Sequence, residues 1–110
     1  MDHTLTLRLL NTPRRGPIAH QAVVALALLA GLPPLAADRA AAAVADVVQR
    51  CPAETVCLTA ALDESAAVVS LSGGDQSWCR EAIEQLADLG SMAESGAVQL
   101  RLERTPLRAV

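Results

Sequence analysis

The feature that most constrains this chain is an uninterrupted apolar run, AVVALALLA, at residues 22–30. Arg14 and Arg15 precede the run and small residues follow it around Ala37, which are the parts of a secretory signal peptide. The same run could instead form a core helix that ends at Gly31. It is too short for a stable transmembrane anchor, because a spanning helix needs about 20 apolar residues.

The residues before the run favour the folded helix. Leu5, Leu7 and Leu9 alternate with polar residues, the period of two that predicts a half-buried strand. The following NTPRRGP is typical of a turn, and Pro17 suits the first position of a helix. A signal peptide has no need of a strand in its charged leader. We therefore expect a strand, a turn and a core helix, with export and maturation near Ala37 as the alternative.

The next segments predict a second helix and two strands. Residues 34–50 are rich in Ala, begin at Pro34 and place Val44, Val47 and Val48 on one helical face, and Pro52 then stops the helix. ETVCLTAAL and AAVVSLS are two β-leaning runs joined by the polar residues 63–65, a connection short enough for a hairpin.

The last third predicts a loop, a helix and a closing strand. SGGDQS is typical of a loop, and WCREAIEQLADLG predicts a helix that ends at Gly90. AVQLRLERT alternates apolar and polar residues before Pro106 blocks further pairing. The complete order predicts one α+β domain over residues 1–110, a two-layer sandwich with helices on one face of a mixed or antiparallel sheet.

Composition excludes several functions. Trp78 is the sole aromatic residue, so the stacking platforms of single-stranded nucleic-acid binding are absent, and we expect no nucleic-acid partner. Residues 1–50 carry five Arg and three Asp, whereas residues 51–110 carry four Arg and nine acidic residues, and the acidic half is expected to be a solvated face. Three cysteines without a CxxC, together with two histidines, predict reduced thiols in a cytoplasmic protein rather than a disulfide framework or a metal site.

The sequence LLAGLPPLAADRAAAAVADVVQRC and the later EAIEQLADLGSMAESGAVQLRLER resemble the small anti-sigma-factor serine kinases of the GHKL (histidine-kinase-like) ATPase superfamily. The resemblance covers roughly residues 4–104. In that family a helix ending in AGL leads through a turn to a helix that carries a Glu and, four residues on, an Asn. The resemblance implies a shortened histidine-kinase-like ATPase fold with ATP and Mg²⁺ as cofactors where the site is retained.

Carried across this resemblance, Asp46 falls at the general-base Glu and Arg50 at the Asn that holds Mg²⁺. A guanidinium has no lone pair for a metal, so Arg50 cannot replace that ligand. Gly73 falls at the adenine-reading Asp. A shifted register through Gly74 to Asp75 puts Ser77 and Cys79 where glycines should follow, and the second Gly-rich box and the lid are missing.

These changes predict a degenerate nucleotide site that needs no cofactor. We therefore expect a cytoplasmic bacterial regulator of transcription that binds a sigma factor or an anti-sigma antagonist, with no membrane partner and with a homodimer through the Ala-rich second helix as an option. An atypical serine kinase that uses Asp46 as its base is the enzyme alternative. Of the remaining candidates, Arg14 and Arg15 are expected to decorate a turn, Trp78 to anchor packing, and His20 to lie on a helix surface or to be half-buried.

Overall fold

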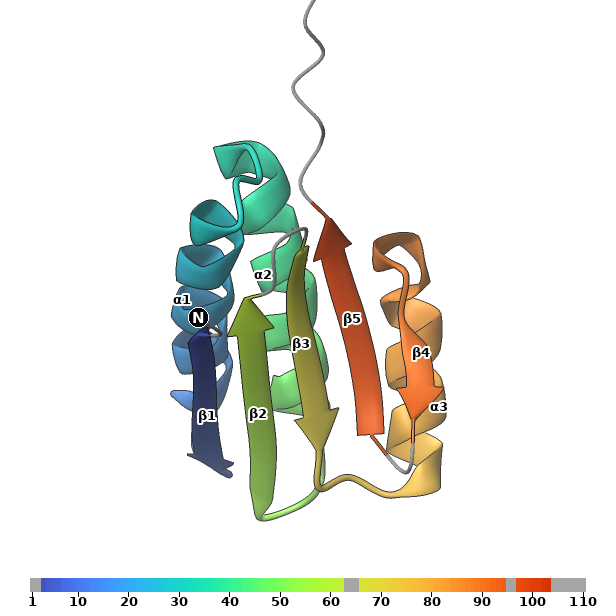
Figure 1. The fold of residues 1–110 in the computed structure, drawn as a ribbon. Coiled ribbons are helices and arrows are strands. Elements are labelled where there is room, and N and C mark those ends of the chain that lie inside the picture. The colour runs from blue at the N-terminus through green and yellow to red at the C-terminus, as the bar shows by residue number, and fades with distance from the viewer. Residues whose placement is uncertain (1–2, 63–65, 95–96, 104–110) are drawn as a thin grey trace, which may run out of the picture.

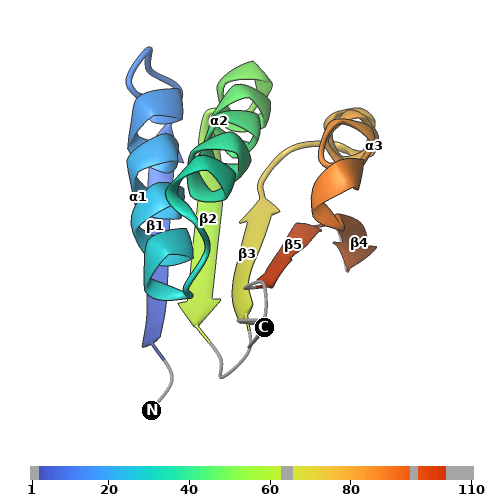
Figure 2. The same ribbon diagram turned by 90° about the horizontal axis from the view of Figure 1, so that it is seen from above.

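The fold is an α+β sandwich of two layers, as the sequence predicts, with an antiparallel sheet covered on one face by helices (Figures 1 and 2). It is seen in a computed structural model that describes residues 3–62, 66–94 and 97–103. Its five strands lie in the order β1-β2-β3-β5-β4. The elements along the chain are β1 (His3–Leu10), α1 (Arg15–Leu29), α2 (Pro34–Arg50), β2 (Thr55–Leu62), β3 (Ala66–Ser72), α3 (Gln76–Gln85), the 3-10 helix η1 (Ala87–Leu89), β4 (Met92–Glu94) and β5 (Ala97–Glu103).

Residues 22–29 of the apolar run lie inside α1 and Ala30 is its C-cap, so the prediction of a core helix is confirmed. Helix α1 begins at Arg15, two residues before the predicted start at Pro17, and the backbone at Gly31 turns with φ 92°. Leu32 N–H donates to the Ala27 carbonyl at 3.0 Å, which closes the helix end. Pro34 occupies the first position of α2, where its missing N–H costs no intrahelical bond.

In the second half of the chain, the structure differs from the sequence prediction at the end of helix α3. Strands β2 and β3 pair antiparallel as expected, but their connection at 63–65 and the predicted stop at Pro106 lie outside the described residues. The predicted single helix ends at Gln85, and η1 follows before Gly90 turns with φ 74°. Strand β4 was not predicted, because three residues are too few to show an alternating pattern.

The core lies between the sheet and the helices. Val44, Val47 and Val48 of α2 are buried, and the alternating residues Val98, Leu100 and Leu102 of β5 belong to the same core cluster. Among residues 4–10 of β1, for which burial is described, only Leu9 is buried, while Leu5 is 42% exposed. This difference in burial follows from the position of β1, because β1 is an edge strand and α1 only partly covers the end of the strand that carries Leu5 (Figure 2).

Candidate functional site

Asp46, the candidate general base, lies on the outer surface of α2. Its Oδ2 is 3.3 Å from Nε of Arg50, one helical turn on, and the two side chains are 52% and 61% exposed. A proton acceptor for phosphoryl transfer works best where water is excluded and charges are held in place. Here the carboxylate is solvated and its nearest partner is a permanent cation.

Asp46 also lines an opening of about 560 Å³ between α1 and α2, away from the sheet. The other lining residues are Gly16, Pro17, His20, Gln21, Ala42, Ala45 and Gln49. His20 contributes an imidazole whose Nε2 is 3.2 Å from Oδ1 of Asp38 on α2, and its side chain is half-buried, as the prediction allowed. Neither Gly73, Gly74 nor Asp75 contributes to this opening.

The glycines of the candidate nucleotide loop have structural explanations. Gly73 has φ 114°, and a Cβ there would lie 2.5 Å from the Thr55 carbonyl oxygen. At Gly74 a Cβ would lie 2.2 Å from Cε3 of Trp78. The first position needs glycine for its backbone conformation and the second for the indole packed on it. Close approach of a phosphate is not required to explain either residue.

Asp75, the alternative adenine-reading carboxylate, caps helix α3. Its Oδ1 accepts a hydrogen bond from Trp78 N at 2.8 Å, which satisfies one of the free N–H groups of the first helical turn. Asp75 and Gly74 line a different opening of about 420 Å³, formed with α3, β4 and the start of β5. The structure therefore does not gather the candidate residues around one of these openings.

Trp78 lies between α2, which carries Asp46, and the loop that carries Gly74 and Asp75. The indole is 5% exposed, packs on Gly74, and donates from Nε1 to the Val47 carbonyl on α2 at 2.9 Å. These contacts place the ring between the α2 backbone at Val47 and the loop before α3. The prediction that Trp78 anchors packing is confirmed.

The residues that the sequence resemblance assigns to an MgATP site do not suit that role. The position of the metal ligand holds the guanidinium of Arg50, the candidate base is paired with it, and the shifted adenine reader is used as a helix cap. No group of three His, Cys, Asp or Glu side chains among residues 3–62, 66–94 and 97–103 is arranged to hold a metal ion.

None of the three cysteines forms a disulfide; Cys51 is buried, and Cys57 and Cys79 are half-buried. Burial raises the pKa of the Cys79 thiol, and the nearby Cys51 and Asp75 add to this effect. The raised pKa keeps Cys79 protonated near neutral pH, and so disfavours a role as nucleophile.

Arg15 is the residue that sequence reasoning placed wrongly. The prediction that Arg14 and Arg15 decorate a turn holds for Arg14, which is exposed, but Arg15 is 1% exposed. Its guanidinium donates to the carbonyls of Cys51 and Ala53, where the α2 helix ends. A positive charge in the first turn of α1 interacts unfavourably with the dipole of that helix. This unfavourable position was the signal in the sequence that the Arg15 side chain binds to another element.

Gln49 completes this link between the helices. Its Oε1 accepts from Gly16 N at 2.8 Å, and its Nε2 donates to the Thr12 carbonyl at 3.2 Å. A Cβ at position 16 would lie 2.8 Å from the same Oε1, so Gly16 allows the contact. Arg15 and Gln49 together fasten the start of α1 to the end of α2.

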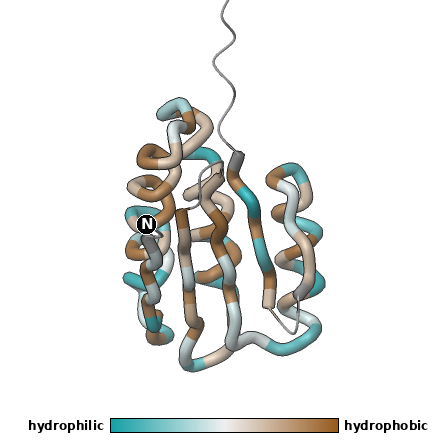
Figure 3. The backbone as a smooth tube through the Cα atoms, viewed as in Figure 1, coloured by the Kyte–Doolittle hydropathy of each residue, from teal (hydrophilic) through white to brown (hydrophobic). Residues whose placement is uncertain are grey.

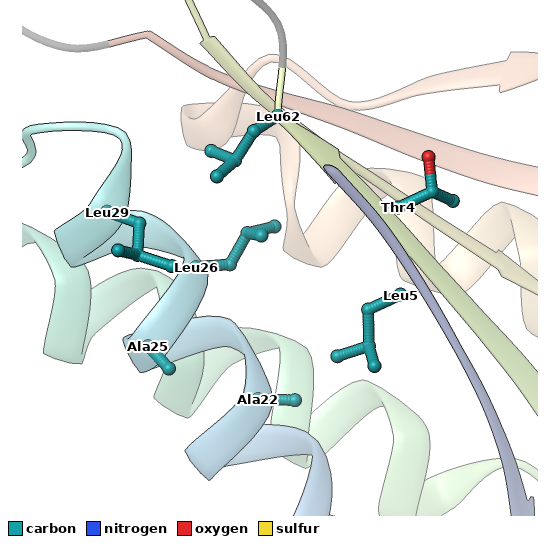
Figure 4. A pocket seen from close by; sticks show the side chains of 7 residues that line it. All are labelled: Thr4, Leu5, Ala22, Ala25, Leu26, Leu29 and Leu62. Atoms are coloured by element: carbon teal, nitrogen blue, oxygen red, sulfur yellow. The ribbon is translucent and has the colours of Figure 1, made fainter. Parts of the chain in front are cut away.

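A third opening is an apolar groove between α1 and the edge strand β1, of about 720 Å³ (Figure 4). We name it the edge groove. It is lined by Thr4, Leu5, Ala22, Ala25, Leu26, Leu29 and Leu62. Figure 4 shows Leu5 of β1 pointing toward Ala22 of α1.

Exposed leucines continue this surface onto the end of the helical hairpin. Leu28 and Leu29 end α1 and Leu35 begins α2, and they are 46%, 75% and 67% exposed. We call these three residues the hairpin leucines. Figure 3 shows hydrophobic segments over most of α1. Apolar side chains gathered on one surface of a folded domain commonly mark a place where another macromolecule binds.

Comparisons with known proteins found no matching family model, no matching curated protein and no matching solved structure. Within the described part of the chain, no helix combines the length and the apolar character needed to cross a membrane.

Proposed function

We propose that this chain is a small cytoplasmic bacterial regulator of the anti-sigma-factor kinase type, which acts by binding a protein partner and does not turn over ATP. The observation that carries the proposal is the position of Trp78. Its buried indole lies between α2 and Gly74, and the candidate base and the candidate nucleotide loop open to separate surfaces.

The hairpin leucines support binding as the activity. Leu29 and Leu35 expose most of their side chains, and Leu28 nearly half. Each buried methylene is worth about 0.8 kcal/mol, so a partner that covers these side chains gains several kcal/mol from apolar burial alone. Part of this gain offsets the loss of translational and rotational freedom on association.

Without phosphoryl transfer, regulation of this kind is stoichiometric. Occupancy of the partner depends on the concentration of this chain and on the dissociation constant, with no catalytic amplification. From the resemblance in sequence, the partner class is a sigma factor or the antagonist protein of an anti-sigma factor.

The packing of α1 supports a chain that keeps its first 37 residues. Cleavage near Ala37 would remove β1 and α1, and with them Leu9, Val23 and Leu26 from the core. It would also leave the end of α2 without the two hydrogen bonds from Arg15. Cysteines that form no disulfide suit a reducing compartment.

The test is capture of partners from the source bacterium on the purified chain, with the bound proteins identified by mass spectrometry. Three forms are compared: the unaltered chain, the double variant Leu28→Gln with Leu35→Gln, and the control Leu10→Gln. Leu10 is 64% exposed and is the last residue of β1, outside the hairpin leucines. The control therefore removes an exposed leucine from a different part of the surface.

We expect a sigma factor or an anti-sigma antagonist with the unaltered chain and the control, and at least about tenfold less with the double variant, since two buried leucines contribute more than 1.4 kcal/mol. Equal capture by all three forms would show that the hairpin leucines are not part of the binding surface. The absence of both partner classes would overturn the proposed function.

A further inference from the structure

Strand β1 forms one edge of the sheet, and it is long and regular (Figure 1). It pairs with β2 over the whole stretch His3–Leu10 without a bulge, and no strand lies on its other side among the described residues. Proteins protect such edges with short strands, prolines, lysines or bulges. The opposite edge is short, because β4 has only three residues, whereas β1 has eight residues and Arg8 as its one permanently charged side chain.

A hydrogen bond just beyond the end of β1 identifies the backbone groups that face β2. Asn11 N–H donates to the Glu54 carbonyl at 2.8 Å, and these two residues continue the register of the β1–β2 pairing. In an antiparallel ladder, hydrogen-bonded pairs alternate with pairs that are not hydrogen-bonded. Counting back from Asn11, the backbone groups that bond β2 belong to Leu9, Leu7 and Leu5.

The residues between these leucines direct their N–H and C=O groups to the free edge. They are Thr4, Thr6 and Arg8. Their side chains lie on the sheet face opposite the helices, because the alternate residues face the helices: Leu9 is buried, and Leu5 points toward α1 (Figure 4). A strand that adds at this edge therefore finds an aligned row of backbone donors and acceptors.

Arg8 places a positive charge on this edge. Its cross-strand neighbour on β2 is Cys57, and the ion pairs found among the described residues do not involve Arg8. Residues 3–37, which include β1 and the whole of α1, contain no Asp or Glu. Opposite charges on directly facing residues of neighbouring strands stabilise pairing, and like charges destabilise it. The edge therefore favours a strand with an acidic residue opposite Arg8 and disfavours a basic one.

The edge groove favours apolar side chains at other positions of an added strand. Leu5 points to the helix side and Leu7 packs against the core, and directly opposite residues of an added strand lie on that same side. A side chain opposite Leu5 lies over the groove between β1 and α1, where Ala22 and Ala25 leave room. Its burial there removes apolar surface from water on both partners.

We propose that the β1 edge binds an extended segment of a partner protein, in which an acidic residue is followed by alternating apolar residues. The segment adds antiparallel to β1, the slightly more stable direction of pairing. From its N-terminal end, its acidic residue lies opposite Arg8, one apolar residue lies opposite Leu7, and a second lies opposite Leu5. Edge binding of this kind does not depend on the partner class proposed above, and a synthetic peptide tests it separately from partner capture.

The test is the binding of such a peptide to the purified chain, measured by fluorescence polarisation. The peptide is Thr-Glu-Val-Thr-Val-Thr-Thr, acetylated at its N-terminus and labelled with fluorescein at its C-terminus. Its glutamate is placed opposite Arg8, and its valines are placed opposite Leu7 and Leu5. A second peptide has lysine in place of glutamate, and a third has serine in place of both valines.

The chain variants are Arg8→Glu and the control Arg80→Glu, which makes the same change of charge at an exposed position on α3. We expect the unaltered chain and Arg80→Glu to bind the glutamate peptide at least about fivefold more tightly than the lysine peptide. Arg8→Glu should reverse this preference, and its binding of the lysine peptide also shows that the variant folds. The serine peptide should bind the unaltered chain at least about tenfold more weakly than the glutamate peptide.

N-methylated peptides test the backbone pairing by itself. N-methylation of the threonine opposite Thr6 removes an N–H that bonds β1, and should weaken binding at least about tenfold. N-methylation of the valine opposite Leu5 replaces an N–H that points away from β1, and should weaken binding less than about threefold. In hydrogen exchange, the Thr6 and Arg8 amides should gain protection with the glutamate peptide, while the α3 amides should not change.

Four results would each overturn the proposal. The first is no saturable binding of the glutamate peptide up to millimolar concentration. The second is the same preference between the glutamate and lysine peptides in Arg8→Glu as in the unaltered chain. The third is equal binding of the two N-methylated peptides. The fourth is a dimer in sedimentation equilibrium whose Thr6 and Arg8 amides are protected without peptide and which does not bind the peptide, because a second copy would then cover the edge.

Discussion

Replacing Arg15 by methionine tests how the two helices are fastened together. Methionine keeps a long apolar side chain in the core but removes the guanidinium. The Cys51 and Ala53 carbonyls at the end of α2 then lose their donors. The neighbouring Arg14→Met removes the same charge from an exposed position and is the matched control.

The structure sets the size of the effect. Two hydrogen bonds from a charged donor contribute about 1.5–3 kcal/mol each. Against this, Nε of Arg15 is buried with no hydrogen-bond partner among the described residues, so that removing the charge also recovers part of its desolvation cost. We expect a net loss of about 2–4 kcal/mol from the free energy of unfolding, a large share of the roughly 5–15 kcal/mol typical of domains.

Urea unfolding followed by the fluorescence of Trp78 measures this loss, because the buried indole is the sole tryptophan of the chain. Arg14→Met should unfold within about 0.5 kcal/mol of the unaltered chain. If the two variants were equally stable, the buried guanidinium would not fasten α1 to α2.

Three further substitutions or measurements address the loop before α3 and its surroundings. Gly73→Ala should cost at least about 3 kcal/mol, and Gly90→Ala about 1–2 kcal/mol, because both need positive φ but only a Cβ at position 73 meets backbone; equal losses in urea unfolding would contradict this ranking. Asp75→Ala should cost about 1 kcal/mol and Asp75→Ser much less, since serine also caps helices; a similar loss for both would argue against the cap. Alkylation of Cys79, followed by mass spectrometry, should require a higher pH in the folded chain than in urea, because a raised pKa leaves less thiolate at any pH below it; a lower midpoint in the folded chain would refute the burial effect.

The sequence predicted the elements with strong periodic patterns. The alternation along β1 and β5, the valines of α2 and the glycine after α1 each correspond to a described element, and the layer arrangement follows from their order. Strand β4 was missed because three residues show no alternating pattern and the strand is defined by its pairing with β5, and the change from α3 to η1 was missed as well.

Site residues were harder to place than elements. The candidate positions Asp46 and Gly73 could be named from the resemblance, but their separation by the Trp78 side chain depends on packing between α2 and α3. Likewise, two adjacent arginines look equivalent in sequence, and only the direction of each side chain at the start of α1 distinguishes exposed Arg14 from buried Arg15.

The measurement that tests the central claim most directly is a calorimetric titration of the purified chain with ATP in the presence of Mg²⁺, repeated with Asp46→Ala. We predict no saturable binding up to millimolar ATP, because Arg50 offers no ligand to the metal and the Trp78 side chain lies between the two candidate halves of the site. Saturable binding at micromolar concentration that disappears in Asp46→Ala would contradict the account and restore a nucleotide-dependent function.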